Sequence, residues 1–253
     1  MKFSAISDVH IKRAGDQAED LLLTFLRNPD VQSSDVVFLL GDIFDLMIGP
    51  LTQYFVRYQA YFDEIKKLMK NGTHICYVEG NHDFHIKLLY RKFFMVHADL
   101  DPSLFSMAPF FEFMNGGKKI YLAHGDDIEL NNPSYKLFKA VVTSPPLRYY
   151  ANYLMPHFLI KGIGEYSAEK SRKRNNKRYS TDADLAPVKD NFRLSVEVFR
   201  KKRTFDVIVL GHSHVKDHYV SPSGFEYINN GYAQHTKTYI SIEDGDISFK
   251  SIF

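Results

Sequence analysis

Five short apolar segments, each followed at once by residues that can bind a metal ion, constrain the fold of this chain more than any other feature. The segments are residues 3–7, 36–40, 75–79, 120–123 and 206–210. Each is too short and too apolar to be a surface helix, so we expect five buried β-strands. Apolar residues at three- and four-residue spacing in 16–27 and 54–70 predict amphipathic helices. Alternating strands and helices are typical of an α/β protein.

The residues that could carry chemistry stand where these strands end. In chain order they are Asp8-Val9-His10, Gly41-Asp42, Gly80-Asn81-His82-Asp83, His124-Gly125-Asp126 and Gly211-His212-Ser213-His214. Ligands of open α/β sheets bind beyond the carboxyl ends of the strands, so we expect these residues to converge. Asp8 and His10 stand two apart, which places both side chains on one face of an extended chain. The adjoining glycines let the backbone turn sharply and approach closely.

The donor atoms in these motifs indicate the kind of site. Carboxylate, amide and imidazole groups without thiolate suit Mn, Fe or Zn. Two divalent ions would bring about four positive charges, of which Asp8 and Asp42 neutralise two. The residual charge of about plus two would attract an anion and could acidify bound water. A phosphate ester gains more from such a site than a peptide does.

Taken in this order, the motifs resemble those of the calcineurin-like metallophosphoesterases, and the resemblance covers nearly the whole chain. It implies a four-layer α/β/β/α sandwich and two divalent ions, with Mn favoured and Fe, Co or Zn as alternatives. The implied ligands are Asp8, His10, Asp42 and His214 for one ion, and Asp42, Asn81, His124 and His212 for the other. His82 would protonate the leaving oxygen or stabilise charge on the phosphate, and Asp83 would orient its ring. Asp45 and Asp126 could support ligands or be polar turn residues.

Two later regions predict further elements. After Gly211, the short strands 218–220, 225–229, 238–242 and 247–252 favour an antiparallel meander. Residues from about 133 to 180 have helical composition between two core strands. We therefore expect one domain over residues 1–253 with an inserted helical cap.

The expected cap contains two unusual segments. Residues 170–178 read KSRKRNNKR, which is either a solvated helix face or a site for a diphosphate or an anionic membrane surface. Residues 145–164 are rich in Tyr, Leu, Ile and Phe. They form the buried side of the cap, line a slot for acyl chains, or lie in the lipid interface beside the basic segment.

A narrower resemblance concerns the sequences GDIFDLMIG (41–49), GNHDF (80–84) and HGD (124–126) followed by YKLF (135–138). They are similar to the UDP-2,3-diacylglucosamine pyrophosphatases of lipid A synthesis, which release UMP and leave a lipid phosphate at the cytoplasmic face of the inner membrane. The resemblance implies a cytoplasmic protein, peripheral at that membrane, with a nucleotide-linked glycolipid substrate. The candidate substrate contacts are Asn132, Lys170, Arg174, Lys177 and His235. The best-known members differ by an arginine at His82, a tryptophan at Met47 and an acid near Asn132.

Other functions are weighed against this one. The runner-up is a calcineurin-like phosphodiesterase or nucleotidase with a soluble substrate. A remoter alternative is a non-catalytic interaction protein on the same fold, although such proteins lose the metal-binding histidines that this chain keeps. With 32 basic and 30 acidic side chains and one local basic run, nucleic acid is a poor candidate partner. The single cysteine, Cys76, excludes a disulfide framework, and no segment is long and apolar enough to span a bilayer.

Overall fold

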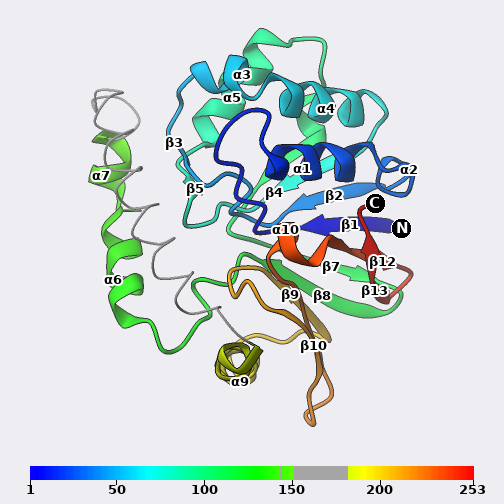
Figure 1. The fold of residues 1–253 in the computed structure, drawn as a ribbon, viewed down its shortest axis with the longest axis vertical. Helices are drawn as coiled ribbons and strands as arrows, with labels where there is room; N and C mark the ends of the chain where they lie inside the picture. The colour runs from blue at the N-terminus through cyan, green and yellow to red at the C-terminus, as the bar shows by residue number, and fades with distance from the viewer. Residues whose placement is uncertain (143, 151–181) are drawn as a thin grey trace.

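The computed structural model describes residues 1–142, 144–150 and 182–253 and folds them around two stacked β-sheets (Figure 1). The six-stranded sheet has the order β13 (Asp246–Ser251), β12 (Thr238–Glu243), β1 (Lys2–Ile6), β2 (Val36–Leu39), β4 (His74–Tyr77) and β6 (Phe105–Met107). The five-stranded sheet has the order β10 (Lys216–Val220), β11 (Glu226–Asn230), β9 (Val207–Leu210), β8 (Lys118–Ala123) and β7 (Phe110–Asn115). A two-stranded ribbon pairs β3 (Met47–Ile48) with β5 (Asp83–Phe84).

The register of the parallel strands brings the motif loops level with one another. In the larger sheet, Ile6 pairs with Leu39, and Leu39 pairs with Tyr77. In the smaller sheet, Ala123 pairs with Leu210. Each of these residues is the last of its strand. The loops that follow therefore begin side by side, three at the edge of one sheet and two at the edge of the other.

Alternation of side chains along the strands explains the layers. In β2, Phe38 faces the space between the sheets, whereas Val37 and Leu39 face the helices on the outer side. In β8, Leu122 faces the space between the sheets and Tyr121 faces outward. Strands that bury both faces need an apolar residue at nearly every position, which these short segments supply.

Helices cover both outer faces of the sandwich, as Figure 1 shows. The helices over the larger sheet are α1 (Gln17–Arg27), α2 (Pro29–Gln32), α3 (Gln53–Arg57), α4 (Gln59–Lys70) and α5 (Lys87–Val96). The long helix α9 (Asp182–Arg200) covers the smaller sheet. Short helical turns are η1 (Pro102–Leu104) and α10 (Ala233–Thr236). The predicted four-layer α/β/β/α sandwich is thus confirmed.

Three details of the predicted elements were wrong or missing. The helix expected at 54–70 is interrupted at Tyr58, whose φ of −115° and ψ of 38° separate α3 from α4. The expected meander is two hairpins in different sheets, because β12 pairs with β1 rather than with β11. The strands β6 and β7 and the helix α5 were not predicted at all.

The first part of the expected cap is helical. The helices α6 (Pro133–Val142) and α7 (Pro145–Tyr149) stand beside the sandwich in Figure 1. Residues 151–180, including Lys170, Arg174 and Lys177, lie outside the described residues, so the complete cap and the single-domain boundary stay predictions. None of the helices in the described part of the chain is long and apolar enough to cross a membrane.

Candidate metal centre

Backbone hydrogen bonds join four of the five motif loops, in two pairs, at the ends of their strands. The N–H of Asp8 donates to the carbonyl of Gly41 at 3.1 Å, and the N–H of His10 donates to the carbonyl of Asp42 at 3.0 Å. In the other sheet, the N–H of Gly211 donates to the carbonyl of His124 at 2.8 Å. These bonds fix the side chains of neighbouring loops relative to one another.

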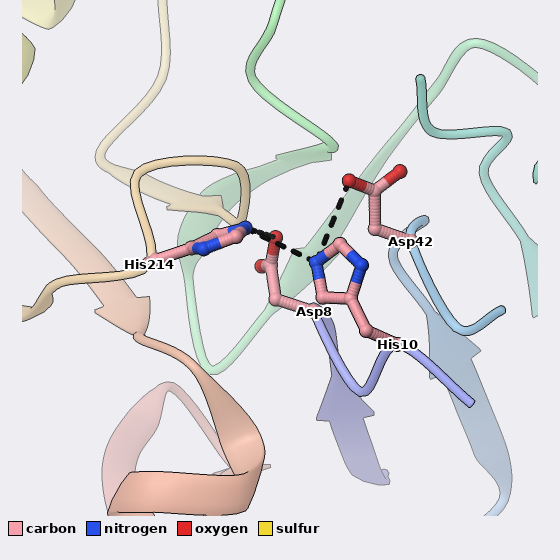
Figure 2. A group of neighbouring side chains, drawn as sticks. All are labelled: Asp8, His10, Asp42 and His214. Atoms are coloured by element: carbon pink, nitrogen blue, oxygen red, sulfur yellow. Dashed lines mark hydrogen bonds and ion pairs between the residues drawn. The ribbon is translucent and has the colours of Figure 1, made fainter. Parts of the chain in front are cut away.

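The first group of candidate ligands is Asp8, His10, Asp42 and His214 (Figure 2), whose donor atoms lie within 4.8 Å of one another. The Nε2 atom of His10 is 3.1 Å from Nε2 of His214 and 3.7 Å from Oδ2 of Asp42. Nε2 of His214 is 3.3 Å from Oδ1 of Asp8. Donor atoms that share one ion at about 2.1 Å lie about 3 Å from one another. The group therefore has the composition and spacing of a metal site.

The second group is Asp42, His124 and His212, with donor atoms within the same 4.8 Å limit. Nε2 of His124 lies 3.6 Å from Oδ2 of Asp42 and 3.2 Å from Oδ1 of Asn81. The amide oxygen of Asn81 thus lies next to this group, and its role as a ligand stays a prediction. Asp42 belongs to both groups, which places it where a bridging ligand would be.

The backbone of these loops is not extended, contrary to our expectation for Asp8 and His10. Positive φ angles occur at Asp8 (53°), His10 (55°), Asp42 (53°), His212 (64°) and His214 (58°). Such angles are uncommon for residues other than glycine and cost of order 1–3 kcal/mol each. The left-handed turns, rather than strand alternation, aim these side chains at a common centre. Strain of this kind is typical of functional sites.

Close packing of the loops requires glycine at two positions. A Cβ on Gly80 would collide with the side chain and backbone N of Asp42. A Cβ on Gly211 would lie 2.6 Å from Oδ2 of Asp8. The predicted close approach of the backbone is confirmed at both positions.

Burial and neighbouring charges have opposite effects on the pKa values of the acids and histidines in the centre. Burial alone would raise the pKa of the Asp8 carboxyl, but its contact with His214 holds that pKa well below the ordinary range. Burial likewise opposes ionisation of Asp42, and the charges of His124 and His82 lower its pKa. Burial would lower the pKa of His124, yet Asp42 and Asp126 raise it to about 9. The two aspartates are therefore anionic near neutral pH and can offer carboxylate oxygens to a cation.

The structure gives His82 a different partner from the one predicted. The Nδ1–H of His82 donates to the backbone carbonyl of Asp45 at 2.9 Å. The carboxylate of Asp83 instead accepts hydrogen bonds from the N–H groups of Asp42 (3.0 Å), Ile43 (2.7 Å) and Gly80 (2.8 Å) and from the Tyr77 hydroxyl (2.6 Å). Asp83 thus connects two loops and does not orient the His82 ring. Its burial and the charge of Asp42 raise the pKa of Asp83 to about 7.

Asp45 and Asp126, whose roles the sequence left open, lie behind the candidate ligands and contact neighbouring side chains. The Oδ1 atom of Asp45 lies 3.7 Å from Nδ1 of His10, on the side of that ring away from His214. Asp126 accepts a hydrogen bond from Lys139 of α6 at 2.6 Å, and Lys139 also lies 2.8 Å from Asp127. The loop after β8 is thereby tied to α6.

The predicted substrate contacts are placed only in part. Nδ2 of Asn132 donates to Oε2 of Glu129 at 3.1 Å. His235 lies on α10, where its ring is 4.7 Å from that of Tyr232, and Tyr232 stacks on His214 at 5.5 Å. Sequence reasoning missed Glu129, a buried acid 3.4 Å from His212. Nothing local to its sequence distinguishes it from an ordinary loop residue.

A cavity of about 810 Å³ opens at the second group of ligands, where Asn81 and His124 form part of its wall. Apolar and aromatic side chains make up much of the rest, including Phe84, Leu88, Met107, Phe110, Tyr121 and Ile128. The helices α6 and α7 contribute Lys139, Pro145 and Tyr149, and α5 contributes Lys87 and Arg91. The cavity joins the candidate metal centre to the described part of the expected cap.

The sequence model of the calcineurin-like phosphoesterases matches residues 1–216. The chain therefore belongs to the calcineurin-like phosphoesterase family and is a hydrolase, and membership implies divalent metal ions. The donor set and spacing of the two groups fit such ions.

Comparison with individual proteins adds a narrower likeness. The UDP-2,3-diacylglucosamine hydrolase of Psychromonas ingrahamii is 24% identical over 253 residues, covering 98% of this chain and 96% of the relative. The enzyme of the same name from Neisseria meningitidis serogroup C is 27% identical over 242 residues, covering 95% and 93%. A solved archaeal phosphodiesterase covers 99% of both chains at 13% identity with a TM-score of 0.47. The resemblance read from the sequence is confirmed.

Proposed function

We propose that this enzyme hydrolyses the pyrophosphate of UDP-2,3-diacylglucosamine to UMP and 2,3-diacylglucosamine 1-phosphate. Relatives named UDP-2,3-diacylglucosamine hydrolase align with this chain over nearly the full length of both proteins. The structural observation that carries the proposal is the cavity that opens at Asn81 and His124. If the pyrophosphate of the substrate bound at the metal centre, its acylated sugar would lie at the mouth of this cavity.

The lining of the cavity suits an amphipathic anion. Its volume of about 810 Å³ lies within the range of roughly 300–1,000 Å³ typical of small-molecule sites. Phe84, Leu88 and Phe110 offer surface for acyl chains, while Lys87 and Arg91 add positive charge. A small soluble phosphodiester would leave most of this apolar surface in contact with water, at an unfavourable free energy.

In the proposed centre, Asp8, His10, Asp42 and His214 hold one ion, and Asp42, Asn81, His124 and His212 hold the other. Manganese is the proposed metal, with Fe, Co or Zn as alternatives, because O and N donors of this kind accept all four. When bound, the two ions supply positive charge that attracts a phosphate and acidifies water. Oδ2 of Asp42 lies 3.7 Å from His10 of the first group and 3.6 Å from His124 of the second, so this carboxylate would serve both ions.

His82 is the proposed proton donor. Its Nδ1–H is held by the Asp45 carbonyl, which fixes the orientation of the ring. A proton on Nε2 would pass to the oxygen of the leaving phosphate as the bond to phosphorus breaks. The Asp83 carboxylate contributes by holding the backbone of Asp42 and Gly80 in place.

We place the enzyme in the cytoplasm, peripheral at the inner membrane. Leu137 and Val141 of α6 are 69% and 55% exposed and stand four residues apart, on one face of the helix. Apolar groups on such a face can enter the boundary between lipid headgroups and acyl chains. The basic run at 170–178 would add attraction to an anionic surface.

Incubation with UDP-2,3-diacylglucosamine and Mn²⁺, followed by chromatography for UMP, tests the proposal. A parallel reaction with bis(4-nitrophenyl) phosphate measures general phosphodiesterase activity, and Asp42→Ala controls for contaminating enzymes. The proposal predicts UMP and diacylglucosamine 1-phosphate in equal amounts. Turnover of the aryl diester with none of the glycolipid would establish the alternative, a phosphodiesterase with a soluble substrate.

A further inference from the structure

We infer that Glu129 positions His212 for the second metal ion and is a functional part of the centre. The inference rests on the proposed metal centre, but not on the identity of the substrate. Oε2 of Glu129 lies 3.4 Å from Nε2 of His212 and accepts a hydrogen bond from Asn132 at 3.1 Å. The Glu129 residue is only 3% exposed.

Burial of this carboxylate needs a compensating partner. An ionised acid removed from water is costly unless it is hydrogen-bonded or paired. The N–H of a histidine ring supplies such a partner, and a histidine that donates from one nitrogen presents its other nitrogen to a metal. Because Nε2 of His212 faces Glu129, Nδ1 would be the nitrogen that binds the ion.

Glu129 is held in this position by its own loop. The N–H groups of Ile128 and Glu129 both donate to the carbonyl of Gly125, at 3.1 and 3.2 Å. The next N–H, of Leu130, donates to the hydroxyl of Ser195 on α9 at 3.1 Å. The carboxylate is thus fixed between the turn after His124 and the helix that covers the smaller sheet.

The His212 ring is confined on its other sides as well. Its centroid lies 5.1 Å from that of His124 and 6.1 Å from that of Phe192. The backbone N–H of His212 donates to the Asp8 carboxylate at 3.0 Å. A rotation of the ring is therefore limited, and Glu129 selects which nitrogen faces the ion.

Glu129 also alters the charge of the second site. Among the ligands proposed there, only Asp42 is anionic, and it is shared with the first ion. A carboxylate behind His212 makes that imidazole a stronger donor and adds negative charge next to the second ion. The ligands proposed for the first ion, Asp8, His10, Asp42 and His214, form a separate group of neighbouring donor atoms.

The test measures binding of Mn²⁺ by calorimetry, with Glu129→Ala, Glu129→Gln and a matched control. The control is Glu64→Ala, because Glu64 is a comparably buried acid, bonded to Arg27 on the far side of the sheet. We expect Glu129→Ala to lower the affinity for the second ion by about 10–100-fold, which is the usual effect of losing a group that orients a metal ligand. Glu129→Gln should recover part of this loss, since its amide oxygen can still accept the ring N–H.

A double variant distinguishes positioning from general structural support. If Glu129 acts through His212, adding Glu129→Ala to His212→Ala should weaken Mn²⁺ binding no further. Wild-type affinity for the second ion in Glu129→Ala would overturn the inference. The inference would also be overturned if Glu129→Ala lowered the affinity for both ions equally and lost as much thermal stability as Glu64→Ala. These readouts are metal affinities, so failure of the glycolipid proposal alone would leave them unchanged.

Discussion

The Nε2 atoms of His10 and His214 lie 3.1 Å apart, although 204 residues separate them in the sequence (Figure 2). His10 lies in the loop after β1 of the larger sheet, and His214 lies in the loop after β9 of the smaller sheet. The contact therefore forms only when the two sheets stack in the observed way. Metal binding and correct packing of the sandwich are linked through this pair.

Loss of the shared carboxylate should affect both ions. We expect Asp42→Ala to lose both bound metals and to lower UMP release by at least about 10²-fold, since even groups behind a ligand contribute 10- to 100-fold. Metal content by plasma mass spectrometry, compared with Glu64→Ala, checks this. Retention of two ions by Asp42→Ala would refute its bridging role.

Removal of the proposed proton donor should separate rate from metal binding. His82→Ala should lower the turnover rate by about 10²–10⁴-fold, the usual contribution of general acid catalysis, while the metal content stays at the wild-type value. The comparison is His10→Ala, which should lose metal. Equal metal loss in both variants would show that His82 is a ligand instead.

A single added methyl group should disturb the centre without changing any ligand. In Gly80→Ala the new Cβ would meet the side chain of Asp42, so the loop must shift, at a cost of about 1–3 kcal/mol. Thermal unfolding and Mn²⁺ titration should both show the defect. Gly224→Ala is the control for metal binding: its φ of 85° makes an alanine strained there, but the added Cβ meets nothing within 4 Å, so stability should fall while Mn²⁺ affinity stays at the wild-type value. Normal metal affinity in Gly80→Ala would contradict the tight packing described here.

Acid sensitivity should arise in part from Asp30, far from the metals. Burial alone would raise the pKa of Asp30, but bonds from Lys2, Tyr239 (2.6 Å) and Lys250 (2.9 Å) lower it below the ordinary 3.8. A lowered pKa in the folded state stabilises the protein above about pH 4 and loses this effect as the pH falls further.

Urea unfolding of the metal-free protein measures this contribution. At pH 7, Asp30→Asn should lower the free energy of unfolding by about 1 kcal/mol, after allowance for solvent screening at a partly exposed group. The difference from wild type should shrink at pH 3. Asp63→Asn is the control, because Asp63 is 48% exposed and only 3.8 Å from Lys66. A difference that grows in acid would contradict the assigned direction.

The sequence predicted what depends on local pattern. Short runs of apolar residues located β2 and β8, and the polar residues after each strand identified Asp42 and His124. The stacking that brings His214 to Asp8, at 3.3 Å, followed from the rule that such loops converge. Pairing of β12 with β1 was not predicted, because hydrogen bonding between strands so distant leaves no local signal.

Orientation within the site was the part that sequence reasoning could not supply. His82 has Asp83 as its neighbour in the chain, yet its ring donates a hydrogen bond to the carbonyl of Asp45. Glu129 and His212 come from separate loops, and their contact depends on how the turn after His124 docks on α9. Such contacts are fixed by backbone turns, several with positive φ, rather than by residue type.

Anomalous diffraction from a crystal grown with Mn²⁺ tests the central claim most directly. The two groups predict two peaks, one among Asp8, His10, Asp42 and His214, and one among Asp42, Asn81, His124 and His212, with Asp42 touching both. A single peak, or manganese bound away from Asp42, would contradict the two-ion centre from which the proposed reaction follows.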